Sequence, residues 1–373
     1  MKEKVYLASP HMGGHEMNYI NEAFETNWIA PLGKNVDSFE KEASGYAGVK
    51  YGAALSSGTA AIHMALKAAG IGKGDIVLCS DLTFSASANP IIYEGAVPVF
   101  IDSDMKTWNM DPAALRLAFE KYPEAKAVII VDLYGLSAEY DELLKICRQH
   151  NAVVIEDSAE ALGSSYKGKK CGSFGDYGIL SFNGNKIITT SGGGMLLSDN
   201  EERIAKVRFW STQAREKARH YQHEELGYNY RMSNIVAGIG RGQLEVLDMR
   251  VEKKRHIFDL YKKGFEEIKE IEMEPQNENC FSNCWLSCIR ISEKSNVSPL
   301  DIMEMLEKEN IESRPIWKPM HMQPFYSDCD FITDRKSGSN GEDIFRTGVC
   351  LPSDTKMSDE TQLEIIRLIK NMF

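Results

Sequence analysis

The sequence predicts an α/β protein with a mostly parallel sheet, and two observations point to this class. Between about residues 76 and 155, short apolar runs of strand length alternate with segments of helical pattern. Functional residue types then follow several of these strands directly, among them Phe84 and Asp157. Parallel sheets with helices on both faces bind their ligands at the carboxyl ends of the strands, so a site is expected at that edge.

The elements are expected in the following order. Two helical segments within residues 13–50 flank the loop 26–33, and the second has Asp37 or Ser38 near its start. An Ala/Leu-rich helix follows Ser57 to Thr59. Strands are then predicted at 76–80, 97–101, 127–131, 152–155 and 178–182, with helices at 85–93, after the cap Asp111-Pro112, and at 139–150.

The pattern changes after residue 243, where a long charged helix begins and is followed by a Cys-rich strand region and shorter helices. We therefore predict a boundary near residue 245. It divides a large domain of residues 1–245 from a smaller C-terminal α+β domain of residues 246–373.

Composition excludes several classes of function. A net charge of −11 argues against a general affinity for nucleic acid or anionic membranes. The N-terminal apolar run is too short for a signal peptide, and no run approaches the roughly 18 apolar residues of a membrane span, so we expect a cytoplasmic protein. The eight cysteines form no CxxC pair, and neither Cys280, Cys284 and Cys288 nor His220 and His223 have a convincing ligand pattern. No metal is expected.

Lys186 is the residue around which the chemistry is organised. It lies on a Gly-broken turn after the apolar strand 178–182, and Gly192 to Gly194 indicate that backbone passes close to another group nearby. The ordinary alternative is a surface lysine. A lysine in a partly desolvated pocket can instead form a Schiff base with a carbonyl group or with pyridoxal phosphate.

Three further features follow other strands. Ser57, Gly58 and Thr59 precede a helix, where they form either a simple N-cap or a cradle for a phosphate. Phe84 offers an apolar face and Asp157 a carboxylate. Pyridoxal phosphate needs phosphate donors, a flat face, an acid for its ring nitrogen and a lysine for its aldehyde, so the four features together predict its site.

The motifs also resemble those of the DegT family of sugar-nucleotide aminotransferases, over nearly the whole chain from about residue 5. The resemblance is carried by Ser57-Gly-Thr59, Thr83-Phe84, Glu156-Asp-Ser-Ala-Glu160, Ser181-Phe-Asn-Gly-Asn-Lys186, Gly192-Gly-Gly194 and Gly227-Tyr-Asn-Tyr-Arg-Met-Ser233. Within the family, Thr107-Trp-Asn-Met-Asp111 and the segment 314–324 look most like enzymes of bacterial diaminosugar synthesis of the bacillosamine type.

The resemblance implies a fold type I architecture like that of aspartate aminotransferase, and a homodimer with composite sites. It implies that Lys186 holds the cofactor, Asp157 pairs with the ring nitrogen, and Phe84 stacks on the ring. Glu160 stands near the ring hydroxyl, where many members have Gln or His. Further roles are implied for Gly58, Thr59 and Ser181 at the phosphate, for Asn229 and Arg231 from the neighbouring subunit, and for Asn27, Trp28, Ile29, Ala30 and His321 at the substrate.

The activity that this implies is transfer of an amino group from glutamate to the C4 ketone of a UDP-4-keto-6-deoxy-N-acetylhexosamine. Lys186 would be the proton-transferring base. Three alternatives remain open: amination at C3 or of a GDP- or dTDP-linked sugar, sugar dehydration, and sugar binding without catalysis. Related dehydratases carry histidine where this chain has Lys186, and a binder would be expected to have lost Lys186, Asp157 or the cradle.

Overall fold

A computed structural model describes residues 3–373, and its largest sheet has eight strands. Their order is β1 (Tyr51–Leu55), β9 (Gly194–Ser198), β8 (Tyr177–Ser181), β5 (Val153–Asp157), β4 (Ala127–Val131), β2 (Ile76–Ser80), β3 (Val97–Ile101) and β14 (Phe331–Ile332). Neighbouring strands from β8 to β14 run parallel, whereas β9 is antiparallel to both β8 and β1. The predicted mostly parallel sheet is confirmed.

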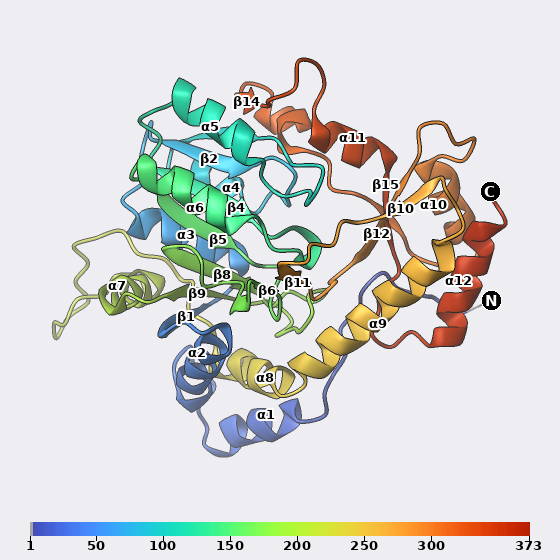
Figure 1. Ribbon diagram of the computed structural model, residues 1–373. Coiled ribbons are helices and arrows are strands. Elements are labelled where there is room, and N and C mark those ends of the chain that lie inside the picture. Colours follow the sequence, from blue (N-terminus) through green and yellow to red (C-terminus); the bar gives the residue numbers. More distant parts are fainter. Residues whose placement is uncertain (1–2) are drawn as a thin grey trace.

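Helices cover both faces of this sheet (Figure 1). The helices of this part of the chain are α1 (Glu16–Glu25), α2 (Lys34–Ala47), α3 (Gly58–Ala68), α4 (Asn89–Tyr93), α5 (Pro112–Lys121), α6 (Tyr140–Gln149), α7 (Glu201–Ser211) and α8 (Asn234–Leu244), against which α1 packs. Strand β4 shows how the layers form, because successive side chains of a strand point to opposite faces. Val128 and Ile130 join the core under α5 and α6, whereas Ala127 and Ile129 join the core with α3, α4 and α7.

Two helix boundaries differ from the prediction. Residues 85–88 form a turn, in which the carbonyl of Ser85 accepts from the amides of Ala88 and Asn89, so helix α4 begins only at Asn89. Pro90 suits this first turn, because its missing N–H would have no helical partner there. Helix α2 begins at Lys34, one turn before the predicted Asp37. The cap at Asp111 is confirmed, since its side chain accepts from the amide of Ala113.

The chain after residue 245 begins with the expected long helix, α9 (Leu247–Phe265), and builds an antiparallel sheet in the order β10 (Ile271–Met273), β12 (Ser287–Ile291), β15 (Gly348–Leu351) and β13 (Arg314–Pro315). Helices α10 (Pro299–Lys308), α11 (Asn340–Thr347) and α12 (Asp359–Lys370) accompany it. A small sheet joins β11 (Cys280–Phe281) to β6 (Ser165–Tyr166) and β7 (Lys169–Lys170). Because β11 and β14 pair with strands of the first 245 residues, the domain boundary stays a prediction.

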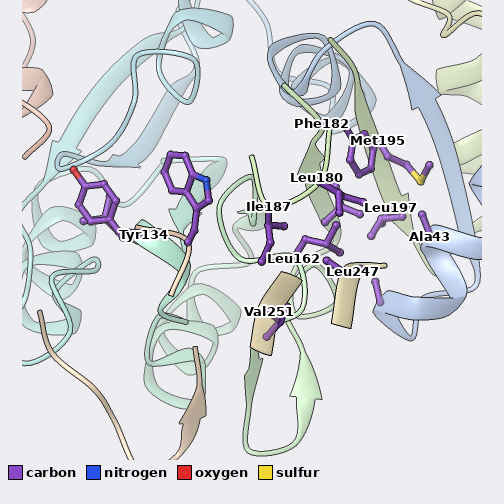
Figure 2. Packing of buried hydrophobic residues seen from close by; sticks show 14 of the residues in the cluster. Ala43, Tyr134, Leu162, Leu180, Phe182, Ile187, Met195, Leu197, Leu247 and Val251 are labelled. Carbon is purple, nitrogen blue, oxygen red and sulfur yellow. The ribbon is translucent and has the colours of Figure 1, made fainter. Parts of the chain in front are cut away.

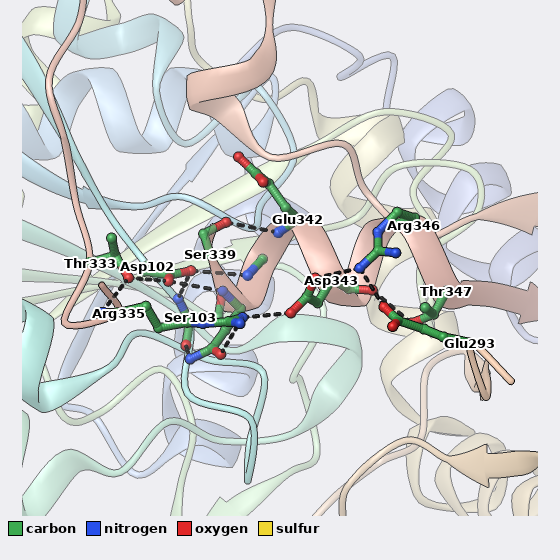
Figure 3. A network of polar contacts seen from close by, with 12 residues as sticks. Asp102, Ser103, Glu293, Thr333, Arg335, Ser339, Glu342, Asp343, Arg346 and Thr347 are labelled. Atoms are coloured by element: carbon green, nitrogen blue, oxygen red, sulfur yellow. Dashed lines mark hydrogen bonds and ion pairs between the residues drawn. The ribbon is translucent and has the colours of Figure 1, made fainter. Parts of the chain in front are cut away.

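Asp102, just after β3, fixes one of these later segments to the carboxyl edge of the large sheet (Figure 3). Its carboxylate accepts from the backbone amides of Asn340 and Gly341, both at 3.0 Å, and from the hydroxyl of Thr333 at 2.7 Å. A carboxylate at the start of a helix also interacts favourably with the helix dipole, here that of α11. Among residues 3–373, no helix has both the length and the apolar character needed to span a membrane.

Candidate active site

A cavity of about 300 Å³ opens at the carboxyl ends of β5 and β8, beside the start of α3. It brings together seven of the predicted site residues, namely Gly58, Thr59, Phe84, Asp157, Glu160, Ser181 and Lys186. Its lining also includes Thr83, Ser87, Trp285 and Trp317, which sequence reasoning did not assign to the cofactor. The tryptophans come from the C-terminal part of the chain, where Trp285 lies outside the motifs quoted above and Trp317 lies within the segment 314–324.

Lys186 lies on a turn between two buried anchors. Phe182 and Ile187 belong to the hydrophobic core shown in Figure 2, and the amide of Lys186 donates to the carbonyl of Asn183. The side chain of Lys186 is only 11% exposed, and its Nζ lies 3.4 Å from Oε1 of Glu160. The same nitrogen lies 4.0 Å from the centroid of the Trp285 ring. The turn thus carries its amine into the cavity rather than to the surface.

Asp157 ends β5 and is buried among neutral donors. Its Oδ2 accepts from the hydroxyl of Ser87 at 2.7 Å, and its Oδ1 accepts from the amide of Ala159 at 3.2 Å. Burial raises the pKa of Asp157, while these two donors and the charge of Lys186 oppose the rise. The bond from Ser87 was missed by sequence analysis, because only the turn at residues 85–88 directs its hydroxyl to Asp157.

Glu160 lies three residues further on and has a charged neighbour instead. Its Oε2 accepts from the amide of Tyr134 at 2.7 Å, and Lys186 approaches its other oxygen. Burial raises the pKa of Glu160, and the charge of Lys186 is the largest opposing influence.

The start of α3 has the features of an anion site. The hydroxyl of Ser57 accepts from the amide of Ala60, which confirms the N-cap, while the amides of Gly58 and Thr59 have no partner within residues 3–373. Ser181 also faces this turn, because a Cβ added to Gly58 would lie 3.3 Å from its Cβ. A Cβ on Gly194 would lie 2.3 Å from backbone atoms of Ser57, so this glycine allows the close approach that the sequence predicted.

These residues fit pyridoxal 5′-phosphate. Two free amides at a helix N-terminus and neighbouring hydroxyls suit its phosphate, and Asp157 suits its ring nitrogen. Phe84 supplies an apolar face, and its ring centroid lies 5.1 Å from that of Trp317. The indole N–H of Trp317 is buried without a partner among the described residues, which leaves one unsatisfied donor at the cavity.

Comparison with known proteins identifies the family. The model of the DegT/DnrJ/EryC1/StrS aminotransferase family matches residues 10–370. The chain belongs to this family. It is 51% identical to EpsN of Bacillus subtilis, a pyridoxal phosphate-dependent aminotransferase by name, over 100% of this chain and 97% of that protein. GDP-perosamine synthase of Caulobacter vibrioides is 38% identical over 87% of each chain.

Solved structures agree with this assignment. Spr1654 of Streptococcus pneumoniae, in its PLP form, superposes with a TM-score of 0.91 at 26% identity and covers 99% of this chain and 98% of its own. A DegT DnrJ EryC1 StrS aminotransferase of Brucella abortus superposes with a TM-score of 0.87 at 27% identity, covering 96% of this chain and 95% of its own. The protein is thus a sugar aminotransferase of fold type I with pyridoxal 5′-phosphate as its cofactor.

Two residues of this aminotransferase that have predicted roles at a partner subunit or at the substrate also have partners within their own chain. The side chain of Arg231 is 8% exposed and is held within the subunit by the carboxylate of Glu40 and the carbonyl of Ala54, and its role at a neighbouring subunit stays a prediction. His321 is held between the carboxylates of Asp81, at 2.7 Å, and Glu342, at 3.0 Å. Both of its ring nitrogens thus have carboxylate partners in the chain, and its role at the substrate stays a prediction.

The other predicted contacts lie on the surface of the single chain. Asn229 is exposed, and so are Asn27, Trp28, Ile29 and Ala30, none of which lines the cavity. The loop is nevertheless ordered by Asn234 at the start of α8, whose side chain donates to the carbonyl of Trp28 and whose amide donates to that of Ala30. Their roles at the substrate or at a neighbouring subunit stay predictions.

One buried group has the composition of a metal site. Ligand atoms of Asp132, Glu156 and Cys171 lie within 4.8 Å of one another. Hydrogen bonds within the chain account for the arrangement, because Ser158 lies between the two carboxylates at 2.7 Å and 2.9 Å and the amide of Phe174 donates to Glu156. The group is a polar core network beneath Asp157, and it needs no ion to satisfy its oxygens.

Proposed function

We propose that this aminotransferase transfers the amino group of glutamate to the C4 ketone of a UDP-4-keto-6-deoxy-N-acetylhexosamine. The placement of Lys186 is the main support for transamination. Its amine lies in the cavity beside Glu160, among the residues that fit the cofactor. When bound there, pyridoxal phosphate supplies the electron sink and the carrier for the amino group. A dehydratase of this kind would instead have histidine at residue 186.

In this proposal each residue of the cavity has one task. Asp157 keeps the ring nitrogen protonated, and the amides of Gly58 and Thr59 hold the phosphate. Lys186 takes a proton from Cα of the amino donor and delivers it to the cofactor, then makes the reverse transfer toward C4 of the sugar. Glu160 places a carboxyl group beside the amine, because its Oε1 lies 3.4 Å from Nζ of Lys186.

The sugar is supported by resemblance and by relatives. A related protein from Campylobacter jejuni is 41% identical over 63% of this chain. It is named a UDP-4-amino-4,6-dideoxy-N-acetyl-β-L-altrosamine transaminase. A GDP-linked 4-amino sugar is the second candidate, because perosamine synthases match 87–98% of the chain. Both candidates share the amination of a nucleotide-linked sugar, and they differ in the nucleotide.

The test is a panel of UDP-, GDP- and dTDP-linked 4-keto and 3-keto sugars, each supplied with glutamate. We expect 2-oxoglutarate and a UDP-4-amino sugar in equal amounts, with the position of the amine established by NMR. Preference for the GDP-linked ketone would favour the second candidate. Exclusive turnover of a 3-keto sugar would refute both.

We also propose that the enzyme acts as a homodimer with composite sites, to which Asn229 contributes from the neighbouring subunit. Asn229 is an exposed residue next to Tyr230, whose carbonyl accepts from the amide of Ser56 beside the cradle. Mixing Lys186→Ala and Asn229→Ala chains should restore activity, because one of the two sites in the mixed dimer is then intact. If subunit exchange is demonstrated and no activity returns, Asn229 acts within its own subunit.

A further inference from the structure

Trp285 contacts the lysine turn in two ways, although it lies 99 positions away in the sequence. Its indole Nε1 donates to the backbone carbonyl of Asn185 at 2.8 Å. Its ring centroid lies 4.0 Å from Nζ of Lys186, well inside the roughly 6 Å at which a lysine ammonium and an aromatic face attract each other. One side chain therefore restrains both the backbone before the lysine and the amine itself.

The segment that carries Trp285 is itself held by hydrogen bonds to α9 and to the backbone at Glu160. Lys254 on α9 donates to the carbonyls of Trp285, at 2.7 Å, and Ser353, at 2.5 Å. Asn283 accepts from the amide of Trp285 and donates to the carbonyl of Glu160 at 2.9 Å. Between them Cys284 is held at a φ of 50°, a left-handed conformation that costs free energy for a residue with a side chain. Such a conformation persists only where the surroundings enforce it.

The polar contact of the amine with Glu160 is a long one. Nζ of Lys186 lies 3.4 Å from Glu160, whereas charge-assisted hydrogen bonds of this kind are typically about 2.7–2.9 Å long. Glu160 thus supplies charge but little directional restraint. The orientation of the lysine depends on the aromatic face and on the bond to the turn.

We propose that Trp285 is a positioning residue, which orients Lys186 for its reaction with the cofactor aldehyde. In that reaction the amine nitrogen bonds to the carbonyl carbon, and the oxygen leaves as water. The proposal rests on the assigned role of Lys186 but not on the identity of the sugar, because no sugar takes part in this step.

The test compares two ligands of the cofactor-free protein. Pyridoxal phosphate can react with Lys186, whereas pyridoxine phosphate has a hydroxymethyl group in place of the aldehyde and reports only on the pocket. In the Trp285→Leu variant, we expect the rate of covalent capture of pyridoxal phosphate to fall at least tenfold. This rate is measured by absorbance. The dissociation constant of pyridoxine phosphate should change less than twofold. Trp285→Phe, which keeps a ring but loses the N–H donor, should fall between wild type and Trp285→Leu.

Trp317→Leu is the matched control, because Trp317 lines the same cavity without a contact to Lys186. Trp317→Leu should weaken the capture of pyridoxal phosphate and the binding of pyridoxine phosphate to the same extent. If the Trp285 variants capture pyridoxal phosphate and bind pyridoxine phosphate less well by the same factor, Trp285 only supports the pocket and the proposal is wrong. An unchanged rate of capture would also overturn the proposal. Trp285→Phe decides the matter by the same comparison if Trp285→Leu does not fold. Reduction of the complex with borohydride, followed by peptide mapping, shows separately whether Lys186 is the lysine that reacts.

Discussion

The two sides of the cavity hold their residues by different means. On the sheet side, Asp157 and Ser181 end the strands β5 and β8, and Gly58 begins α3, so the backbone ladder and the helix fix each of them locally. On the aromatic side, Trp285 and Trp317 lie in loops and depend on distant partners. Lys254 donates to the carbonyl of Trp285, and the amide of Trp317 donates to the hydroxyl of Tyr134 at 2.9 Å.

The chemistry is divided in the same way. The sheet side carries the charged and hydrogen-bonding groups that act on a cofactor. The aromatic side supplies ring faces that orient those groups. Substitutions on the sheet side should therefore reduce turnover, and those on the aromatic side should alter orientation and fit. Residues at the junction of the two sides should affect stability more than chemistry.

Lys186→Ala should have the largest effect. We expect turnover to fall by at least roughly 10²–10⁴-fold, the usual contribution of a positioned acid–base group, because covalent attachment is lost as well. Borohydride reduction of the wild type should leave the cofactor on the peptide that contains Lys186. An adduct on another lysine would contradict the division between the two sides of the cavity, because the sheet side would then not carry the reacting amine.

Asp157→Asn should follow, with a loss of about 10²–10³-fold in turnover, as for other preorganised electrostatic groups. An amide cannot hold the ring nitrogen protonated, although it can still accept a hydrogen bond from Ser87. The measurement is kcat with saturating substrates, together with the absorbance spectrum of the loaded enzyme. Turnover within a few fold of wild type would show that the ring nitrogen has another partner.

Ser87→Ala tests whether the orientation of Asp157 matters as much as its charge. Loss of a hydrogen bond to a charged group costs about 1.5–3 kcal/mol, so turnover should fall roughly tenfold or more. Removal of this donor also raises the pKa of Asp157, because the bond from Ser87 opposes the effect of burial. Ser87→Thr, which keeps the hydroxyl, should restore most of the activity. A similar loss in both variants would indicate a steric effect at the turn.

Particular residues show how far the sequence could predict this site. Lys186, Asp157 and the cradle at Gly58 could be found because each follows an element with a strong local pattern, and the parallel strands bring their carboxyl ends to one edge. Trp285 and Ser87 could not, because their positions depend on long-range contacts or on an irregular turn. Trp317 was marked only as part of the segment 314–324, without a role at the cofactor. The contact that Arg231 makes within its own subunit could not be predicted for a related reason. Its partner Glu40 lies 191 positions away, and no local pattern pairs them.

Arg231 and Asn229 should respond differently to truncation. Arg231→Ala removes one of two arginines that pair with the buried carboxylate of Glu40, the other being Arg208. We expect a loss of about 1.5–3 kcal/mol in the free energy of unfolding, measured by denaturant titration. Asn229→Ala changes an exposed side chain, so its effect on stability should stay within about 0.5 kcal/mol even if activity falls. Equal stability of the two variants would mean that Arg231 is not held by Glu40.

The smallest expected effect concerns His321, which joins the two sides of the cavity. It follows Trp317 in the chain and is bonded to Asp81, which lies just after β2. Burial alone would lower the pKa of His321, but the bonds and charges of Asp81 and Glu342 outweigh it and raise the pKa to about 9. The folded protein therefore binds a proton more tightly at His321 than the unfolded chain, in which histidine titrates near 6.5.

His321→Gln isolates this contribution, because glutamine can hydrogen-bond but does not titrate. The stabilisation by the charged histidine is fully present below pH 6.5 and is lost as the pH rises through 9, since unfolding releases its proton within that window. We expect the difference in unfolding free energy between wild type and variant to shrink by about 1–2 kcal/mol from pH 6 to pH 9.5, after allowance for solvent screening. A difference that stayed constant, or grew with pH, would mean that His321 is neutral between its carboxylates and that packing alone joins the two sides.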